Sequence, residues 1–333
     1  MKIKNKIFDK IEETFKDVEF EDVEFNIEYL NSYFENCKFI NCKFNSKFNS
    51  DIIKDVHFIG CDFSGSEFKN SYFLNVKFED MEMDNFFNVI TFQKTTFKNI
   101  TFKDNKLLTG SFNECEFENV KFENIEFIKF TFYKTNSDIK FKNCKFIKTS
   151  LKEMELKNHD FSNFYFEVVS FDNSTLENCI FDNSTLKIVS FLDTTLINCS
   201  FFNVVSQSST FENSNIKNTN FIHSIFERND FSGIKGENIG FENVNINYSM
   251  FVNSVLNNIK FQDNSMDNLD FSYAILENIK SDKIPKNSNF HKTQFYESDI
   301  DDRYYIPNEA LIRAEDWEVD DELVGLKEEN EKY

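Results

Sequence analysis

Cysteine and histidine are the residues of this 333-residue chain best suited to metal binding or nucleophilic catalysis. The seven cysteines include no C-x2-C pair, so a zinc ribbon is not indicated, and an odd number cannot form a complete disulfide framework. The four histidines are spread along the chain as His57, His159, His223 and His291. No phosphate-binding loop and no Ser/His/Asp set accompanies them. The sequence therefore predicts no catalytic, cofactor-binding or metal-binding residue, and it predicts a protein that is not an enzyme.

A period of five organises the chain that carries these residues. From Phe141 to Leu276 every fifth residue, 28 positions in all, is large and apolar except Ser206 and Gly236. A helix of period 3.6 or a strand of period 2 does not produce this pattern. Four shorter blocks have the same spacing, and the register slips by one residue at each junction; the blocks are Phe15–Phe25, Phe34–Phe44, Phe48–Met83 and Phe87–Phe132.

These central positions account for 37 of the 44 phenylalanines, so the excess of Phe is a structural requirement and not an aromatic binding surface. Seven central positions spaced by 20 residues from Phe141 to Phe261 are all Phe, whereas the seven from Leu156 to Leu276 include none. Four five-residue sides therefore complete one turn. The pattern predicts an all-β solenoid, a quadrilateral β-helix of about 13 coils with about 20 residues in each, and a rod of ~60 Å.

Small residues stand two positions before the centres, and all seven cysteines are among them: Cys37, Cys42, Cys61, Cys115, Cys144, Cys179 and Cys199. We interpret them as small buried apolar side chains. Cys42 and Cys61, and also Cys179 and Cys199, are four sides apart, so each pair is expected to stack in adjacent coils and to stay reduced. His159 occupies the same inward position and is interpreted as a core residue.

Asn recurs two positions after the centres, as at Asn178, Asn198 and Asn218. Asn tolerates positive φ better than any residue except Gly, so this position is expected to form the corner between two sides.

These features resemble the pentapeptide-repeat family. The resemblance covers residues 15–280 and implies a right-handed quadrilateral β-helix with a large central residue and a small residue two positions earlier. Where members of the family commonly have Ala at the small position, this chain has only Ala274. Some members bind DNA gyrase or related topoisomerases, which makes a DNA-mimicking modulator of gyrase one function that the resemblance implies.

The two ends of the chain differ from the repeats. Residues 1–14 are expected to be an N-terminal cap segment, because Ile3, Ile7, Ile11 and Phe15 have the spacing of a short helix.

Residues 281–333 are expected to form an irregular last coil and an acidic helical C-terminal cap. Phe290, Phe295 and Ile300 continue the spacing of five, and a helical stripe follows that consists of Leu311, Ala314 and Trp317. This segment is expected to cover the last coil, and a homodimer contact through the C-terminal region is the alternative.

Charge and composition narrow the function. The chain has a net charge of −20, of which residues 15–280 carry −13. Duplex DNA over a ~60 Å rod would carry about 35 charges, so DNA mimicry is the weaker hypothesis and direct binding of nucleic acid is not expected. The chain has no signal sequence or membrane span, which predicts a cytoplasmic location without membrane association. We predict a non-enzymatic scaffold that binds an unknown protein partner.

Overall fold

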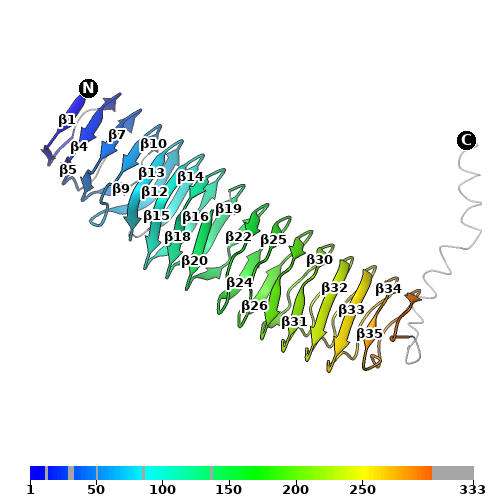
Figure 1. The fold of residues 1–333 in the computed structure, drawn as a ribbon. Helices are drawn as coiled ribbons and strands as arrows, with labels where there is room; N and C mark the ends of the chain where they lie inside the picture. The colour runs from blue at the N-terminus through cyan, green and yellow to red at the C-terminus, as the bar shows by residue number, and fades with distance from the viewer. Residues whose placement is uncertain (12–13, 29–33, 50–51, 85–86, 136–137, 302–333) are drawn as a thin grey trace, which may run out of the picture.

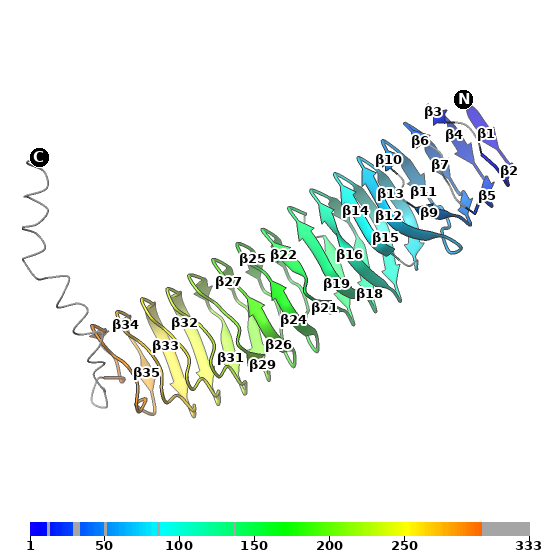
Figure 2. The same ribbon diagram turned by 180° about the vertical axis from the view of Figure 1, so that it is seen from behind.

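The computed structural model describes residues 1–11, 14–28, 34–49, 52–84, 87–135 and 138–301, and it is an all-β solenoid of about 14 turns. Successive coils stack along one rod, with the N-terminus at one end and β36 (Gln294–Tyr296) near the other (Figure 1, Figure 2). All pairs of neighbouring strands are parallel, as consecutive coils of a solenoid require; the first such pair is β1 (Lys2–Lys4) with β4 (Glu19–Glu21).

The strands form four sheets. Two of them begin at the N-terminal end. The first has nine strands: β1, β4, β7 (Lys38–Ile40), β11 (His57–Ile59), β13 (Lys77–Met83), β15 (Thr96–Lys103), β17 (Glu116–Glu118), β18 (Val120–Glu123) and β20 (Ile139–Lys142). The second has three strands: β2 (Ile7–Phe8), β5 (Glu24–Phe25) and β8 (Lys43–Phe44). A thirteen-stranded sheet runs from the second coil past the middle of the rod; it contains β3 (Phe15–Lys16), β6 (Phe34–Glu35), β9 (Lys47–Asn49), β10 (Ile52–Lys54), β12 (Glu67–Leu74), β14 (Phe87–Gln93), β16 (Lys106–Asn113), β19 (Glu126–Tyr133), β21 (Lys145–Ile147), β22 (Ser150–Lys152), β24 (Tyr165–Ser170), β26 (Thr185–Ser190) and β29 (Val205–Gln207).

An eleven-stranded sheet completes the C-terminal half; it contains β23 (Glu155–Lys157), β25 (Thr175–Glu177), β27 (Thr195–Ile197), β28 (Ser200–Phe202), β30 (Asn215–Lys217), β31 (Asn220–Ile222), β32 (Lys235–Glu242), β33 (Val255–Gln262), β34 (Ile275–Glu277), β35 (Lys280–Ser281) and β36. We number the four sides of a coil from their central residues in the coil that begins at Phe181: side 1 has Phe181, side 2 Leu186, side 3 Phe191 and side 4 Leu196.

The core is a set of stacked rings. Phe181 is fully buried between Phe161 and Phe201, with ring centroids 5.1 and 4.9 Å away. Phe191, on the opposite side of the coil, packs edge-to-face against the same ring, with 84° between the two ring planes. Stacking along the rod and edge-to-face contacts across it are both favourable arrangements of aromatic rings, which explains why Phe recurs at these centres.

The register slips follow from the lengths of the coils. Phe166 pairs with Leu186, 20 residues further on, whereas Phe25 pairs with Phe44, 19 residues further on. The shorter coil still places a large residue in register with the one before it.

The helix predicted for residues 1–14 is not formed in residues 1–11 and 14. Ile3 lies in β1 and pairs with Phe20, and Phe8 lies in β2 and pairs with Phe25, while Ile7 points to solvent. The spacing of five between Ile3 and Phe8, and not the spacing of four, therefore determines the structure of this segment. Pairing with the second coil satisfies the backbone of this segment, and the Lys6 ammonium lies 4.2 Å from the centroid of the otherwise uncovered Phe8 ring.

The C-terminal end keeps the expected irregular coil. Phe290 stacks on Phe271, Phe295 pairs with Leu276, and Ile300 is buried. The predicted acidic helix, with its stripe of Leu311, Ala314 and Trp317, lies outside the described residues.

Candidate functional site: the apolar surface of the C-terminal coils

The corners determine how outward side chains are presented. Two residues after most centres the backbone has positive φ, as predicted; Asn183 has φ 58°, and the Ser184 N–H donates to the Phe181 carbonyl at 3.1 Å. Positive φ at the third residue, with this hydrogen bond, defines a type II turn.

Asparagines at the corner after side 4 also bond to each other along the rod. The Asn178 side-chain amide donates to Asn158 Oδ1 at 3.0 Å, and the same bond recurs at every coil as far as Asn258. These bonds use amide groups that would otherwise be free to recognise a partner, so this corner is a structural one.

The corner between sides 2 and 3 departs from this pattern. From the coil of Val89 to that of Tyr248 it contains no Asn; its residues are Val89, Thr109, Lys129, Lys148, Val168, Ile188, Ser208, Arg228 and Tyr248. All of the β-branched residues with positive φ in the described part of the chain are at this corner, namely Val89, Thr109, Val168 and Ile188. Left-handed backbone costs such residues ~1–2 kcal/mol each, because Cβ approaches the following carbonyl oxygen.

Exposed apolar side chains gather beside this corner in the C-terminal coils. On side 2, Val205 and Ile225 are neighbours in adjacent coils and are 47% and 45% exposed. Val168 and Ile188 lie at the corner between sides 2 and 3, separated from them by the outward column of Glu167, Lys187, Gln207 and Glu227. On the other edge, across the corner between sides 1 and 2, are the side-1 residues Ile180, Phe202 and Ile222. We call these seven residues the apolar surface; Ile222 is half-buried, and the other six are exposed.

Uncharged polar groups separate the two sides of this surface. The Asn203 side-chain amide donates to Asn183 Oδ1 at 2.8 Å. The His223 ring lies 5.5 Å from the Phe202 ring, and its Nδ1 accepts a hydrogen bond from Asn243 Nδ2 at 2.8 Å. The surface therefore combines aliphatic, aromatic and amide groups, and the charged residues Glu167, Lys187 and Glu227 lie among them on side 2. Its chemistry suits contact with another protein surface, because exposed apolar areas of this kind mark interaction sites.

The residues first considered for chemistry lie apart. On side 4 the Nε2–H of His57 donates a hydrogen bond to Glu79 Oε2 at 3.1 Å, and burial lowers the pKa of His57 although Glu79 opposes this effect. His159 is buried and its ring lies 5.6 Å from that of Phe161, as expected of a core residue. His291 lies beside Tyr273 near the C-terminal end. Among the described residues no three His, Cys, Asp or Glu side chains come together as metal ligands.

All seven cysteines are buried and free, as predicted. Burial raises the pKa of Cys115 to about 12 and that of Cys144 to about 11. In the stacked pairs, burial followed by the Cys42 thiol raises the pKa of Cys61, and the Cys199 thiol followed by burial raises that of Cys179. The neutral thiol is the favoured form, which agrees with a packing role.

Five-residue sides, four sides to a coil, a large and a small residue pointing inward on each side and a left-handed residue at each corner together define one repeat. The chain forms a solenoid of five-residue repeats, which is the fold that its resemblance to pentapeptide-repeat proteins implies.

Comparisons with known proteins were made by sequence and by structure. No model of a protein family matches the sequence, and no curated protein matches it. Among solved structures, a trypsin-treated form of QnrB1, a plasmid-mediated fluoroquinolone resistance protein, aligns over 60% of this chain and 90% of its own with 13% identity and a TM-score of 0.39. HetL, a pentapeptide-repeat protein involved in regulating heterocyst differentiation in a Nostoc cyanobacterium, aligns over 76% of this chain and 88% of its own with 8% identity and a TM-score of 0.26.

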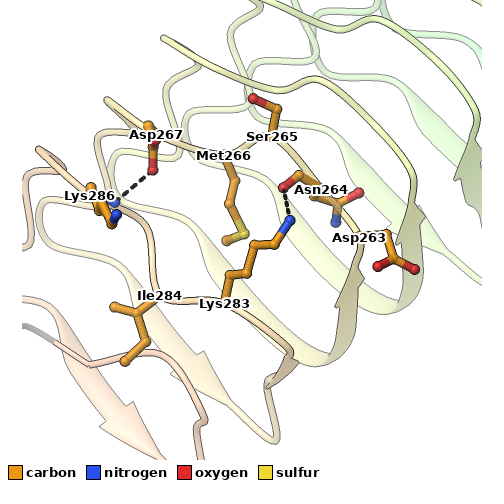
Figure 3. A pocket seen from close by; sticks show the side chains of 8 residues that line it. All are labelled: Asp263, Asn264, Ser265, Met266, Asp267, Lys283, Ile284 and Lys286. Carbon is orange, nitrogen blue, oxygen red and sulfur yellow. Dashed lines mark hydrogen bonds between the residues drawn. The ribbon is translucent and has the colours of Figure 1, made fainter.

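A polar hollow of about 560 Å³ lies beside the last coil of the solenoid (Figure 3). Lys283, Ile284 and Lys286 line one wall, and the segment from Asp263 to Asp267 lines the other. In the coil below, the Val244 carbonyl accepts a hydrogen bond from the Ser265 N–H, whereas here the Asn264 carbonyl accepts one from Lys283 Nζ at 3.3 Å.

The hollow follows from the sequence of the last coil. Pro285 has no N–H to donate to the neighbouring strand, and this coil is one residue short, since Leu276 pairs with Phe295, 19 residues further on. The walls carry both carboxylates and ammonium groups, so their charge selects no single class of ligand.

The sequence reasoning did not find the apolar surface. It predicted no location for the partner-binding surface, although Val205 and Ile225 are 20 residues apart and so had to be neighbours on one side. A comparison of outward positions across coils would have found them. In the described part of the chain no helix is long and apolar enough to cross a membrane.

Proposed function

We propose that this solenoid is a non-enzymatic interaction scaffold that binds a protein partner through the apolar surface. The observation that carries this proposal is the uneven distribution of exposed apolar side chains. Among the described residues, ten large ones are exposed in residues 160–280 and two in residues 15–159. The core is the same in both halves, so packing does not require this difference.

Backbone strain at Val168 and Ile188 supports the same surface. Both residues have positive φ and exposed side chains, with φ 55° for each, where Asn is the common residue at other corners. Left-handed backbone destabilises the folded protein by ~1–2 kcal/mol at each of these residues, and burial of their side chains does not offset it. Such strain is typical of positions retained for contact with another molecule.

A charge test separates this proposal from DNA mimicry. Residues 160–280 carry 15 acidic and 6 basic residues over about six coils, a net charge of −9. Duplex DNA over a similar length of ~30 Å carries about 18 charges, so the charge density of these coils is about half that of the DNA that they would imitate. We expect no inhibition of gyrase supercoiling at micromolar concentration. Clear inhibition would favour the gyrase hypothesis over the scaffold.

The scaffold proposal is tested by affinity capture with matched variants. Val205→Glu places a charge at the centre of the apolar surface, and Val255→Glu places the same charge at the equivalent exposed position of side 4. We expect wild type and Val255→Glu to retain a protein from cells that make this chain, and Val205→Glu to lose it. Equal retention by all three proteins would place the binding surface elsewhere.

A further inference from the structure

We infer that a second copy of this chain binds side 2, antiparallel, with a two-fold axis at the level of Val205 and Gln207. This inference rests on the proposed function, because it names the occupant of the apolar surface. It starts from the two columns of outward side chains that side 2 presents. One column consists of Lys145, Tyr165, Thr185, Val205, Ile225, Asn245 and Ser265, and the other of Ile147, Glu167, Lys187, Gln207, Glu227, Asn247 and Asp267.

Symmetry determines what these columns meet. When two flat faces are related by a two-fold axis that lies between them and across the rods, each column faces the same column of the other copy in reverse order. Residues at equal distances above and below the axis are therefore opposite each other. The level of the axis is the one variable, and charge can select it.

The level of Val205 and Gln207 gives matched contacts. Val205 meets its own copy across the axis, and Ile225 meets Thr185 of the second copy. Lys187 meets Glu227 of the second copy, and symmetry makes this ion pair twice. Glu167 meets the uncharged Asn247, so no two like charges of these columns are opposite each other.

The neighbouring levels do not share this property. An axis one coil lower places Lys187 opposite its own copy, and an axis one coil higher does the same to Glu227. An axis half a coil lower places Glu167 opposite Glu227, and one half a coil higher places it opposite Asp267. Like charges directly opposite each other are destabilising, so one register of five is free of repulsion.

The size of the contact indicates a weak, reversible dimer. The columns cover seven levels, or ~29 Å along the rod at the spacing of parallel strands. Such a strip is smaller than the roughly 800 Å² that each partner contributes to a standard interface. Two copies of net charge −20 also repel each other at long range, so added salt is expected to strengthen association until the Lys187–Glu227 pairs are screened in turn.

Sedimentation equilibrium of the full-length chain from low to high micromolar concentration tests the inference. We expect a monomer–dimer equilibrium that Val205→Glu abolishes, because it brings two carboxylates together at the axis, and that Val255→Glu leaves within about twofold. Circular dichroism of both variants shows whether they are folded. The substitution is on an exposed side chain, so a folded Val205→Glu protein is expected.

A charge swap provides a second test that does not depend on Val205. Lys187→Glu alone and Glu227→Lys alone should each weaken dimerisation by roughly fivefold or more, because each creates two repulsive contacts. The double variant should restore it, although the Lys187 pair with Glu167 within one copy, at 2.9 Å, stays broken. Restoration therefore reports the contact between copies.

Three outcomes would overturn the inference: a chain that is monomeric at every concentration, a dimer that Val205→Glu leaves intact, or single charge variants that the double variant does not rescue. A monomeric chain that still captures another protein in a Val205-dependent manner would remove the second copy as the occupant and keep the proposed function. Loss of both would remove the proposed function too.

Discussion

The N-terminal and C-terminal coils have one core and two different surfaces. Residues 15–159 contain 20 basic and 24 acidic residues, whereas residues 160–280 contain 6 and 15. Ion pairs link adjacent coils in the first region, as where Glu126 lies 2.8 Å from Lys106 and 3.4 Å from Lys145. Among the described residues, hydrogen bonds between asparagine side chains are more frequent in the second region, as from Asn198 to Asn178 at 3.1 Å.

The difference shows that inward and outward positions of the repeat vary independently. The inward residues set the fold, and any pair of outward residues that tolerates its neighbours one coil away can accompany them. Desolvating charges of both signs costs free energy, so the N-terminal coils are the less favourable surface for contact with another protein. The C-terminal coils, with fewer charges, can present apolar groups.

The largest expected effect tests whether the core is the same in both regions. Phe97→Ala in the N-terminal coils and Phe181→Ala in the C-terminal coils should each lower the free energy of unfolding by about 3–5 kcal/mol, because each removes a fully buried ring from a stack. Urea denaturation followed by circular dichroism measures both. The exposed Lys260→Ala serves as the control and should change stability by less than about 0.5 kcal/mol. A loss below about 1 kcal/mol at either Phe would contradict the stacked core there.

Much of this core could be predicted from the sequence, because every coil repeats it. The positions of Phe161, Phe181 and Phe201, the buried cysteines and the positive φ at Asn corners follow from period and composition. The N-terminal helix was wrong because Ile3, Ile7 and Ile11 match a helical spacing by chance. Outward residues have no period, so their grouping depends on the lengths of coils.

The next largest effect is a loss of stability at alkaline pH. It should be greater in the N-terminal coils, because five of the seven cysteines lie there. Burial raises the pKa of Cys115 to about 12, above the value of about 8.5 in an unfolded chain. The unfolded chain then loses its proton first, so stability is intact below about pH 8.5 and falls as pH rises toward 12.

The variant Cys115→Ser with Cys144→Ser removes two of these thiols. Between pH 9 and about 11 its stability should fall less steeply than that of wild type, by up to ~1.4 kcal/mol per pH unit for each thiol. Denaturant melts at several pH values measure the slopes. Parallel curves for the two proteins would contradict the burial of these thiols as neutral groups.

Exchanging Asn and Ile should change stability by less than the core substitutions do. The change should be stabilising at the corner of Ile188 and destabilising at the corner of Asn198. Ile188→Asn should stabilise the protein by about 1 kcal/mol, since it relieves left-handed strain at an exposed residue. Asn198→Ile should destabilise it by about 1–2 kcal/mol, because it introduces that strain and removes the bonds to Asn178 and Asn218. Thermal melts followed by circular dichroism compare both with wild type. If Ile188→Asn is neutral or destabilising, this corner is not strained, and backbone strain no longer supports the proposed role of the apolar surface.

The smallest expected effect concerns the ion pairs, which are the most visible difference between the regions. Lys106, and then Lys145, hold the pKa of Glu126 below its ordinary value. A lowered pKa means that these contacts stabilise the folded protein above the unfolded pKa of about 4.3 and that this stability is lost as pH falls through the folded value. All three side chains are partly exposed, so Glu126→Gln should cost less than about 1 kcal/mol at pH 7 and almost nothing in about 1 M salt.

Glu167→Gln in the C-terminal coils removes a carboxylate with a single lysine partner, Lys187, and should cost less than Glu126→Gln. Urea melts of both variants at low and high salt make the comparison. A loss above about 2 kcal/mol for Glu126→Gln that salt leaves unchanged would mean that charge, and not the Phe stack, holds the N-terminal coils together.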